Sequence, residues 1–295
     1  MRVLEPPYRQ HKHRKKRPKG KIIIVLISMT AVGVLVWYYY QDKKPANTTV
    51  AQKETSQKPT NESLTSSQTT QQIKTFSSQE FRDLYTAIAA TYPNIKEITS
   101  PPAITGSPAA DDRIRMIAER RGYKLRSIPV APIVKINESG LEGDDLLQAK
   151  AFEGWQELKA AAAKDKVPIR LLSAYRSLEY QRDLFNSRMQ AAGVSVDNIV
   201  GGSQDILINQ VLSLAAPPGY SRHHIGYTID LACYPAGQFV AFGTSECYKW
   251  ISTNNYLKAK QNGWVPSYPS GTTDQGPEPE PWEYVWVGKN AVLQK

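Results

Sequence analysis

The chain has 295 residues and a formal net charge of +10, from 37 Lys and Arg against 27 Asp and Glu. Nine of the basic residues fall within residues 1–21 beside a single acid, which leaves only +2 for the rest of the chain. A positive charge confined to one end, with no interleaved basic and aromatic residues after it, argues against nucleic-acid binding and favours a membrane topology signal.

An uncharged segment over residues 22–40 follows this basic tail. Its 19 residues, at about 1.5 Å each along a helix, are enough to cross a bilayer. The Lys and Arg cluster before it predicts a cytoplasmic N-terminus. A cleaved signal peptide is the alternative, but its apolar region would be shorter and followed by small residues rather than by Trp37 and three tyrosines. We therefore expect an uncleaved single-pass anchor in the cell membrane, with the lipid bilayer as a partner.

Residues 41–78 are rich in Ser, Thr, Gln, Lys and Asn, with too few apolar residues to bury a core. This composition predicts a flexible stalk that holds the following domain away from the bilayer. Residues 79–295 are then expected to form one extracytoplasmic domain.

Hydrophobic periodicity predicts the elements of that domain. The first expected helix begins near residue 81, and further helices are expected over 110–121, 144–163, 178–192, 204–214 and 246–261. The expected strands cover 167–175, 226–231 and 282–287. Because helices and strands do not alternate strictly, the pattern predicts a single α+β domain.

Histidine is scarce in the predicted domain. The chain has four, and His11 and His13 lie in the basic tail, which leaves the adjacent His223 and His224. Neighbouring histidine side chains diverge, so we expect any metal site to combine one His with carboxylates.

Three motifs occur in a fixed order along the second half of the chain. Residues 173–181 fit S-x-Y-R-S-x-x-x-Q, residues 221–230 fit S-x-H-x-x-G-x-x-x-D, and residues 280–283 read Glu-Pro-Trp-Glu against an E-x-W-H block. This set resembles the D-alanyl-D-alanine carboxypeptidases of the vancomycin-resistance type. The resemblance implies the hedgehog-like and lysostaphin-like peptidase fold, in which a small antiparallel sheet with flanking helices carries zinc.

The resemblance also implies roles for the matched residues. His223 and Asp230 would bind one zinc ion, Glu280 would be the general base toward the attacking water, and Arg176 would stabilise the oxyanion. Three residues would contact the substrate: Ser221, Gln181 and Tyr175. The implied activity is zinc-dependent D,D-carboxypeptidase hydrolysis of the terminal D-Ala-D-Ala amide of peptidoglycan stem peptides.

Glu283 stands where the family places its second zinc histidine. With His223, Asp230 and Glu283 as ligands, the set carries one more negative charge than His, Asp and His. A more negative set makes the ion a poorer Lewis acid, so Glu283→His is expected to raise activity near neutral pH. Since Glu280 and Glu283 are three residues apart, both reach one ion only if the chain turns or bulges near Pro281.

Two alternatives remain open for the function. The same fold also suits an endopeptidase that cuts a cell-wall cross-link, because the motifs describe the scissile centre and not the length of the pocket. In the other alternative, Glu283 marks a lapsed metal site and the domain is a non-catalytic peptidoglycan-binding pseudoenzyme.

Cys233 and Cys247 are the only cysteines of the chain. In an exported domain, oxidising conditions favour a disulfide between them. Two buried free thiols are the alternative.

Overall fold

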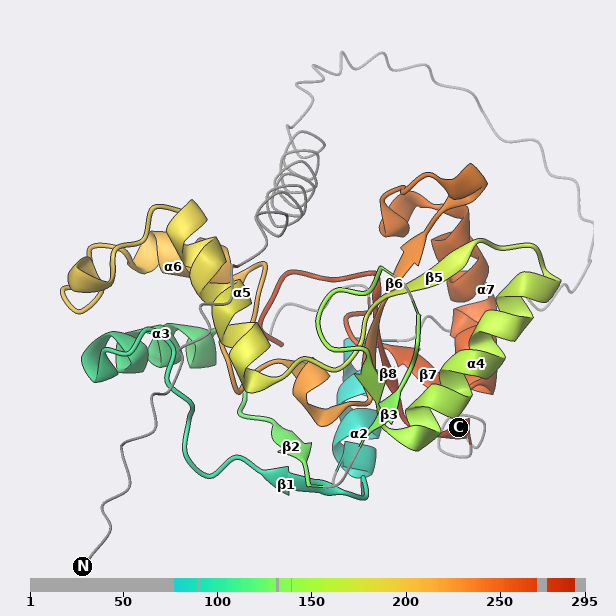
Figure 1. Cartoon of the computed structure of the whole chain (residues 1–295), viewed down its shortest axis with the longest axis horizontal. Coiled ribbons are helices and arrows are strands. Elements are labelled where there is room, and N and C mark those ends of the chain that lie inside the picture. Colours follow the sequence, from blue (N-terminus) through green and yellow to red (C-terminus); the bar gives the residue numbers. More distant parts are fainter. Residues whose placement is uncertain (1–76, 90, 131–132, 139, 270–274, 290–295) are drawn as a thin grey trace, which may run out of the picture. The chain divides into compact units, whose positions relative to one another are not determined.

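The computed structural model describes residues 77–89, 91–130, 133–138, 140–269 and 275–289 (Figure 1). All of these ranges fall within one compact unit, residues 69–295. None of the helices in them is long and apolar enough to span a membrane. The predicted basic tail (1–21), the predicted span (22–40) and residues 41–76 of the predicted stalk lie outside the described residues.

Each helix expected from the sequence has a counterpart in the structure. The helices are α2 (Ser78–Ala89), α3 (Pro108–Arg120), α4 (Ala149–Lys164), α5 (Leu178–Ala191), α6 (Asp205–Leu212) and α7 (Glu246–Gln261). The strands are β1 (Ile95–Glu97), β2 (Ser127–Pro129), β3 (Val134–Lys135), β4 (Leu146–Leu147), β5 (Ile169–Ser173), β6 (Thr228–Cys233), β7 (Trp264–Pro266) and β8 (Glu283–Trp286). This mixture agrees with the predicted α+β class.

A four-stranded antiparallel sheet with the order β5-β6-β8-β7 lies at the centre of the described unit. Strand β6 is buried along its whole length and pairs with β5 on one side and β8 on the other. In this register Asp230 lies opposite both Ser173 of β5 and Glu283 of β8. The sheet therefore brings together residues that are far apart in the sequence.

Two hydrophobic clusters hold the unit together. The larger one contains the sheet with α2, α4 and α7, and includes the fully buried Trp155 and Trp264. The smaller one contains side chains of α3, α5 and α6, and Figure 1 shows these three helices gathered to one side of the sheet. Each large apolar side chain that is fully buried contributes about 1.5–3 kcal/mol relative to exposure.

Two predicted helices differ from the structure in detail. Helix α4 begins at Ala149 rather than at residue 144, because residues 146–147 pair with β3 instead. Helix α7 contains a break at residues 253–256, where Asn254 and Asn255 adopt positive φ angles of 51° and 56°. Asn tolerates this left-handed region better than most residues.

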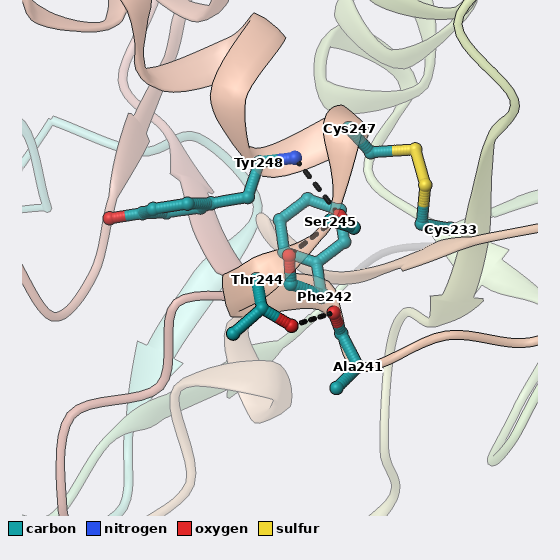
Figure 2. Close-up of a disulfide and its surroundings, with 7 residues drawn as sticks. All are labelled: Cys233, Ala241, Phe242, Thr244, Ser245, Cys247 and Tyr248. Carbon is teal, nitrogen blue, oxygen red and sulfur yellow. Dashed lines mark hydrogen bonds between the residues drawn. A yellow bond between two sulfur atoms is a disulfide. The ribbon is translucent and has the colours of Figure 1, made fainter.

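Cys233 and Cys247 form a disulfide in the structure (Figure 2). The bond joins the end of β6 to the first turn of α7, and both side chains are fully buried. The Ser245 hydroxyl caps the same turn by accepting a hydrogen bond of 3.2 Å from the Tyr248 backbone N–H. The pairing thus fixes the connection between the central strand and α7.

We predict that the double variant Cys233→Ala and Cys247→Ala loses about 3 kcal/mol of unfolding free energy, as the chain-entropy model gives for a loop of this length. Urea denaturation followed by circular dichroism measures the loss. Wild-type protein treated with a reducing agent is the matched control and should unfold at a similarly lowered urea concentration. A wild type whose midpoint does not respond to reduction would contradict the prediction.

Candidate metal centre

His223 lies on a single turn of 3-10 helix, η2 (Arg222–Ile225), immediately before β6. Ser221 caps this turn, since its hydroxyl accepts a hydrogen bond of 3.3 Å from the His223 backbone N–H. Gly226 ends the turn with a φ of 75°, a conformation that favours glycine. The Ser and Gly of the motif therefore shape the turn that carries the histidine.

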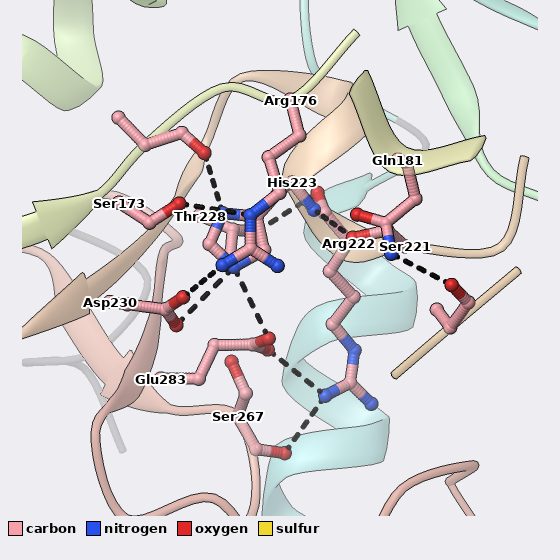
Figure 3. A network of polar contacts seen from close by, with 12 residues as sticks. Ser173, Arg176, Gln181, Ser221, Arg222, His223, Thr228, Asp230, Ser267 and Glu283 are labelled. Carbon is pink, nitrogen blue, oxygen red and sulfur yellow. Dashed lines mark hydrogen bonds and ion pairs between the residues drawn. The ribbon is translucent and has the colours of Figure 1, made fainter. Parts of the chain in front are cut away.

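The structure brings His223, Asp230 and Glu283 together (Figure 3). His223 Nε2 lies 3.3 Å from Asp230 Oδ1 and 3.5 Å from Glu283 Oε2. One potential ligand atom from each residue lies within 4.8 Å of the other two, and all three residues are buried. Asp230 and Glu283 are neighbours because they face each other across β6 and β8.

The chemistry of this cluster fits a metal ion. His223 Nδ1 lies 2.5 Å from the Ala174 carbonyl oxygen, which can only accept, so Nδ1 carries the proton and Nε2 keeps its lone pair in the neutral ring. Among the described side chains, His223 Nε2 and Asp230 Oδ1 are buried and face each other at 3.3 Å, and neither atom makes a hydrogen bond of good geometry. Such atoms are costly to bury unless something binds them, and one nitrogen with carboxylate oxygens is a donor set that zinc accepts.

The members of the cluster shift one another's pKa values. Burial lowers the pKa of His223, and so does Arg176, but Asp230 and Glu283 outweigh both and raise it to about 9. Burial raises the pKa values of Asp230 and Glu283, but the positive charge of His223 lowers both. Arg176 lowers the pKa of Asp230 further and Arg222 that of Glu283, so both pKa values lie below their usual range. The contacts of the cluster therefore favour a proton on His223 and the charged forms of both carboxylates.

Glu280 reaches the same cluster through a turn, as the sequence analysis required. Pro281 and Trp282 form the turn, and the Glu283 backbone N–H donates to the Glu280 carbonyl oxygen at 3.1 Å. Burial raises the pKa of Glu280 well above its ordinary value, and the carboxylates of Glu283 and Asp230 raise it further. Its carboxyl group therefore holds a proton more readily than an ordinary glutamate does, as a group that both accepts and returns a proton must.

Arg176 lies three residues after the end of β5 and contacts the cluster directly. Its Nε donates to the Ser173 hydroxyl at 2.9 Å, and its Nη2 pairs with Asp230 Oδ2. The guanidinium is mostly buried, so this is not the surface ion pair that an arginine after a strand commonly forms.

His224 points away from the cluster and positions Arg176 instead. Its Nδ1 donates to the Arg176 carbonyl oxygen at 2.7 Å, and its Nε2 accepts from the Gly219 backbone N–H at 3.0 Å. Burial is the main cause that lowers the pKa of His224 to about 4. The two adjacent histidines therefore diverge, as expected.

The three residues expected at the substrate differ in position. Gln181 is buried and donates from Nε2 to the Ala216 carbonyl oxygen at 2.7 Å, and Ser221 is buried in its capping role. Tyr175 is half-buried. In this structure Gln181 and Ser221 hold the segments around the cluster, and Tyr175 has the most accessible side chain of the three.

Sequence reasoning missed Arg222, which occupies a variable place in the S-x-H block. It is buried, and its Nη1 lies 3.5 Å from Glu283 Oε1. The signal that could have found it is the pair of opposite charges, Arg222 and Glu283, in two blocks that are expected to meet at one site.

We predict that zinc binds more tightly as the pH rises from 6 toward 9. The ion needs the lone pair of His223 Nε2, and with a pKa of about 9 that atom holds a proton throughout this range, so binding must release it. The apparent affinity should rise by up to about tenfold per pH unit. Titration calorimetry in two buffers of different ionisation enthalpy should count about one released proton at pH 7. A constant affinity between pH 6 and 8 would refute the assignment.

Residues 144–289 match the family model described as VanY, D-alanyl-D-alanine carboxypeptidase. A Bacillus subtilis (strain 168) protein named "Putative carboxypeptidase YodJ" is 26% identical over 149 residues, which cover 50% of this chain and 48% of that protein. The chain thus spans about half the length of this curated relative.

Two solved structures are also similar. One is the vancomycin-resistance D,D-pentapeptidase VanY of a VanB-type cassette with Zn(II), at 20% identity and a TM-score of 0.45, covering 60% of this chain and 92% of that one. The other is the LD-carboxypeptidase LdcB, at 23% identity and a TM-score of 0.42, covering 55% and 69%. Through residues 144–289, the chain belongs to the VanY family of D-alanyl-D-alanine carboxypeptidases.

Proposed function

We propose that the chain is a metal-dependent D,D-carboxypeptidase that removes the terminal D-alanine of peptidoglycan stem peptides. The observation that carries this proposal is the buried cluster of His223, Asp230 and Glu283, whose potential ligand atoms lie within 4.8 Å of one another inside the VanY-family segment. Glu280 and Arg176, the residues expected to act on the scissile amide, lie beside the same cluster.

His223, Asp230 and Glu283 would hold one zinc ion. Zinc bound there supplies Lewis acidity toward the scissile carbonyl and toward water. Glu280 supplies the proton transfers: its carboxylate takes a proton from the attacking water, and the carboxylic acid then returns it to the leaving amine. The raised pKa of Glu280 suits both steps.

Arg176 supplies positive charge near the carbonyl oxygen of the substrate. One of its terminal nitrogens pairs with Asp230 and its Nε donates to Ser173, which fixes the plane of the guanidinium. The second terminal nitrogen, Nη1, is the donor that would face the developing oxyanion. His224 fixes the backbone of Arg176 because its Nδ1 donates a hydrogen bond to the Arg176 carbonyl oxygen.

A non-catalytic peptidoglycan-binding domain is the second candidate, and one observation favours it. Each acidic member of the cluster has an arginine partner, Arg176 for Asp230 and Arg222 for Glu283. A cluster neutralised in this way could persist without metal while the surrounding groove still held a peptide.

We also propose that the domain acts outside the cell, carried by the basic tail at 1–21, the anchor at 22–40 and the stalk at 41–78. The charge and hydropathy patterns of the sequence support this arrangement. Protease added to intact cells should digest the domain from residue 79 onward, and a domain that stays protected would refute it.

The full chain, purified in detergent and loaded with zinc, should release one alanine mass from pentapeptide muropeptides, as followed by mass spectrometry. Removal of zinc with a chelator should stop the reaction, and added zinc should restore it. If zinc is bound but the muropeptides stay intact, the carboxypeptidase proposal is refuted and the non-catalytic binding domain remains. Cleavage inside a cross-link would instead identify an endopeptidase.

In the same assay we predict that Glu280→Gln lowers kcat by about 10²- to 10⁴-fold, the usual effect of removing a general base. Zinc content should be unchanged, because Glu280 is not among the predicted ligands. The exposed Glu278 is a matched control, and Glu278→Gln should keep full activity. An unchanged rate in Glu280→Gln would remove Glu280 from the mechanism.

A further inference from the structure

The guanidinium of Arg222 is buried beside Glu283 (Figure 3). Its Nη1 lies 3.5 Å from Glu283 Oε1 and donates to the Ser267 carbonyl oxygen at 3.3 Å. Its Nη2 donates to Gln275 Oε1. Among the described residues, Glu283 is the one acidic group that forms an ion pair with Arg222.

Aromatic rings cover the faces of this guanidinium. Its central carbon lies 4.3 Å from the ring centroid of Tyr268, 4.8 Å from that of Phe81 and 5.8 Å from that of Tyr85. These rings attract a cation without neutralising its charge. Glu283 is therefore the group that offsets the positive charge of Arg222.

Helix α2 supplies two of these rings, Phe81 and Tyr85, and lies outside the segment that matches the family. Its first residue, Ser78, also accepts a hydrogen bond of 3.2 Å from Gln275 Nε2. An element outside the matched segment therefore helps to hold Arg222 beside the residue that departs from the family pattern.

The charges of the cluster then add up differently. His223, Asp230 and Glu283 carry two negative charges as metal ligands, and Arg222 offsets one of them. The remaining charge equals that of a set with two histidines and one aspartate, which is the set that the family resemblance implied.

We propose that Arg222 and Glu283 act together as an electrically neutral third ligand, with Glu283 binding the metal and Arg222 as the positioning residue that orients its carboxylate and offsets its charge. This inference rests on the proposed function only for the presence of a metal ion at the cluster. It reverses the expectation from the sequence that Glu283→His alone would improve the site, because that change leaves Arg222 buried beside a cation without its acidic partner.

The test is a double-mutant cycle on zinc affinity, measured with the full chain by competition with a chromogenic chelator. Glu283→His alone should weaken zinc binding by about 10- to 100-fold, the range seen when groups that support metal ligands are lost. Combined with Arg222→Gln, the same change should cost less than about threefold, because removing the unpaired arginine restores the total charge.

The pair would be overturned if Glu283→His lowered zinc affinity equally with Arg222 present and with Gln at 222. Tighter zinc binding by Glu283→His alone would also overturn it. Equal losses are expected if Arg222 is purely structural, since its removal would then lower the unfolding free energy whatever residue stands at 283. Arg113 offers a matched control because it forms an ion pair with Asp205 on α6, outside the cluster. Arg113→Gln should leave both zinc affinity and the cost of Glu283→His unchanged.

Circular dichroism and urea denaturation without metal check that each variant folds. If Glu283→His does not fold, Glu283→Gln removes the same charge with little change in shape. Arg222→Gln should then recover the part of the zinc affinity that the unpaired arginine costs, although the lost ligand is not replaced. A wild type that binds no zinc would refute the pair. If the zinc affinities show coupling between Arg222 and Glu283 but the wild type leaves muropeptides intact, the pair is supported and the peptidase activity is refuted. If the wild type cleaves muropeptides but the zinc affinities show no coupling, the peptidase activity is supported and the pair is refuted.

Discussion

The rest of the candidate site depends on the pairing of Asp230 with Glu283 across two central strands. The register of β6 and β8 places both carboxylates on one buried spot, and the turn before β6 adds the imidazole of His223. Buried carboxylates this close repel each other and are costly to desolvate, so the fold must supply positive charge. Arg176 and Arg222 do so from different sides, each through one carboxylate oxygen, and the other oxygen of each acid faces His223 Nε2, where a metal ion would bind.

These arginines change how the departure at Glu283 is understood. Counting only the ligands makes the set too negative for an effective Lewis acid, and that count led to the expectation that histidine at 283 would be better. With Arg222 held beside Glu283 by rings from α2, the relevant unit is an acid and base pair rather than a lone carboxylate. The departure from the family pattern at Glu283 and its pairing with Arg222 are then two parts of one feature.

Much of this site could be predicted from the sequence, because its ligands lie in short motifs whose spacing is set by local geometry. The capped turn at Ser221 and the chain reversal at Pro281 both follow from neighbouring residues. Arg222 could not be assigned in the same way, since Phe81 and Tyr268 come from distant parts of the chain. The sequence pattern also did not predict that Gln181 and Ser221 would be buried.

The fold shows the same division between local and distant causes. Helices with a clear apolar stripe, such as α3 and α5, were predicted to within a few residues. Strands of two or three residues, such as β3 and β4, carry too little periodicity to be recognised and form because a distant partner pairs with them. The late start of α4 has this cause, since residues 146–147 are taken by that pairing.

The central claim is that His223, Asp230 and Glu283 bind one metal ion, and anomalous X-ray diffraction at the zinc edge tests it most directly. Crystals of zinc-loaded protein should show a single strong peak in the cluster, about 2.0–2.2 Å from His223 Nε2 and from an oxygen of each carboxylate. A cluster without a peak, with Arg222 and Arg176 still paired to the two acids, would contradict the account.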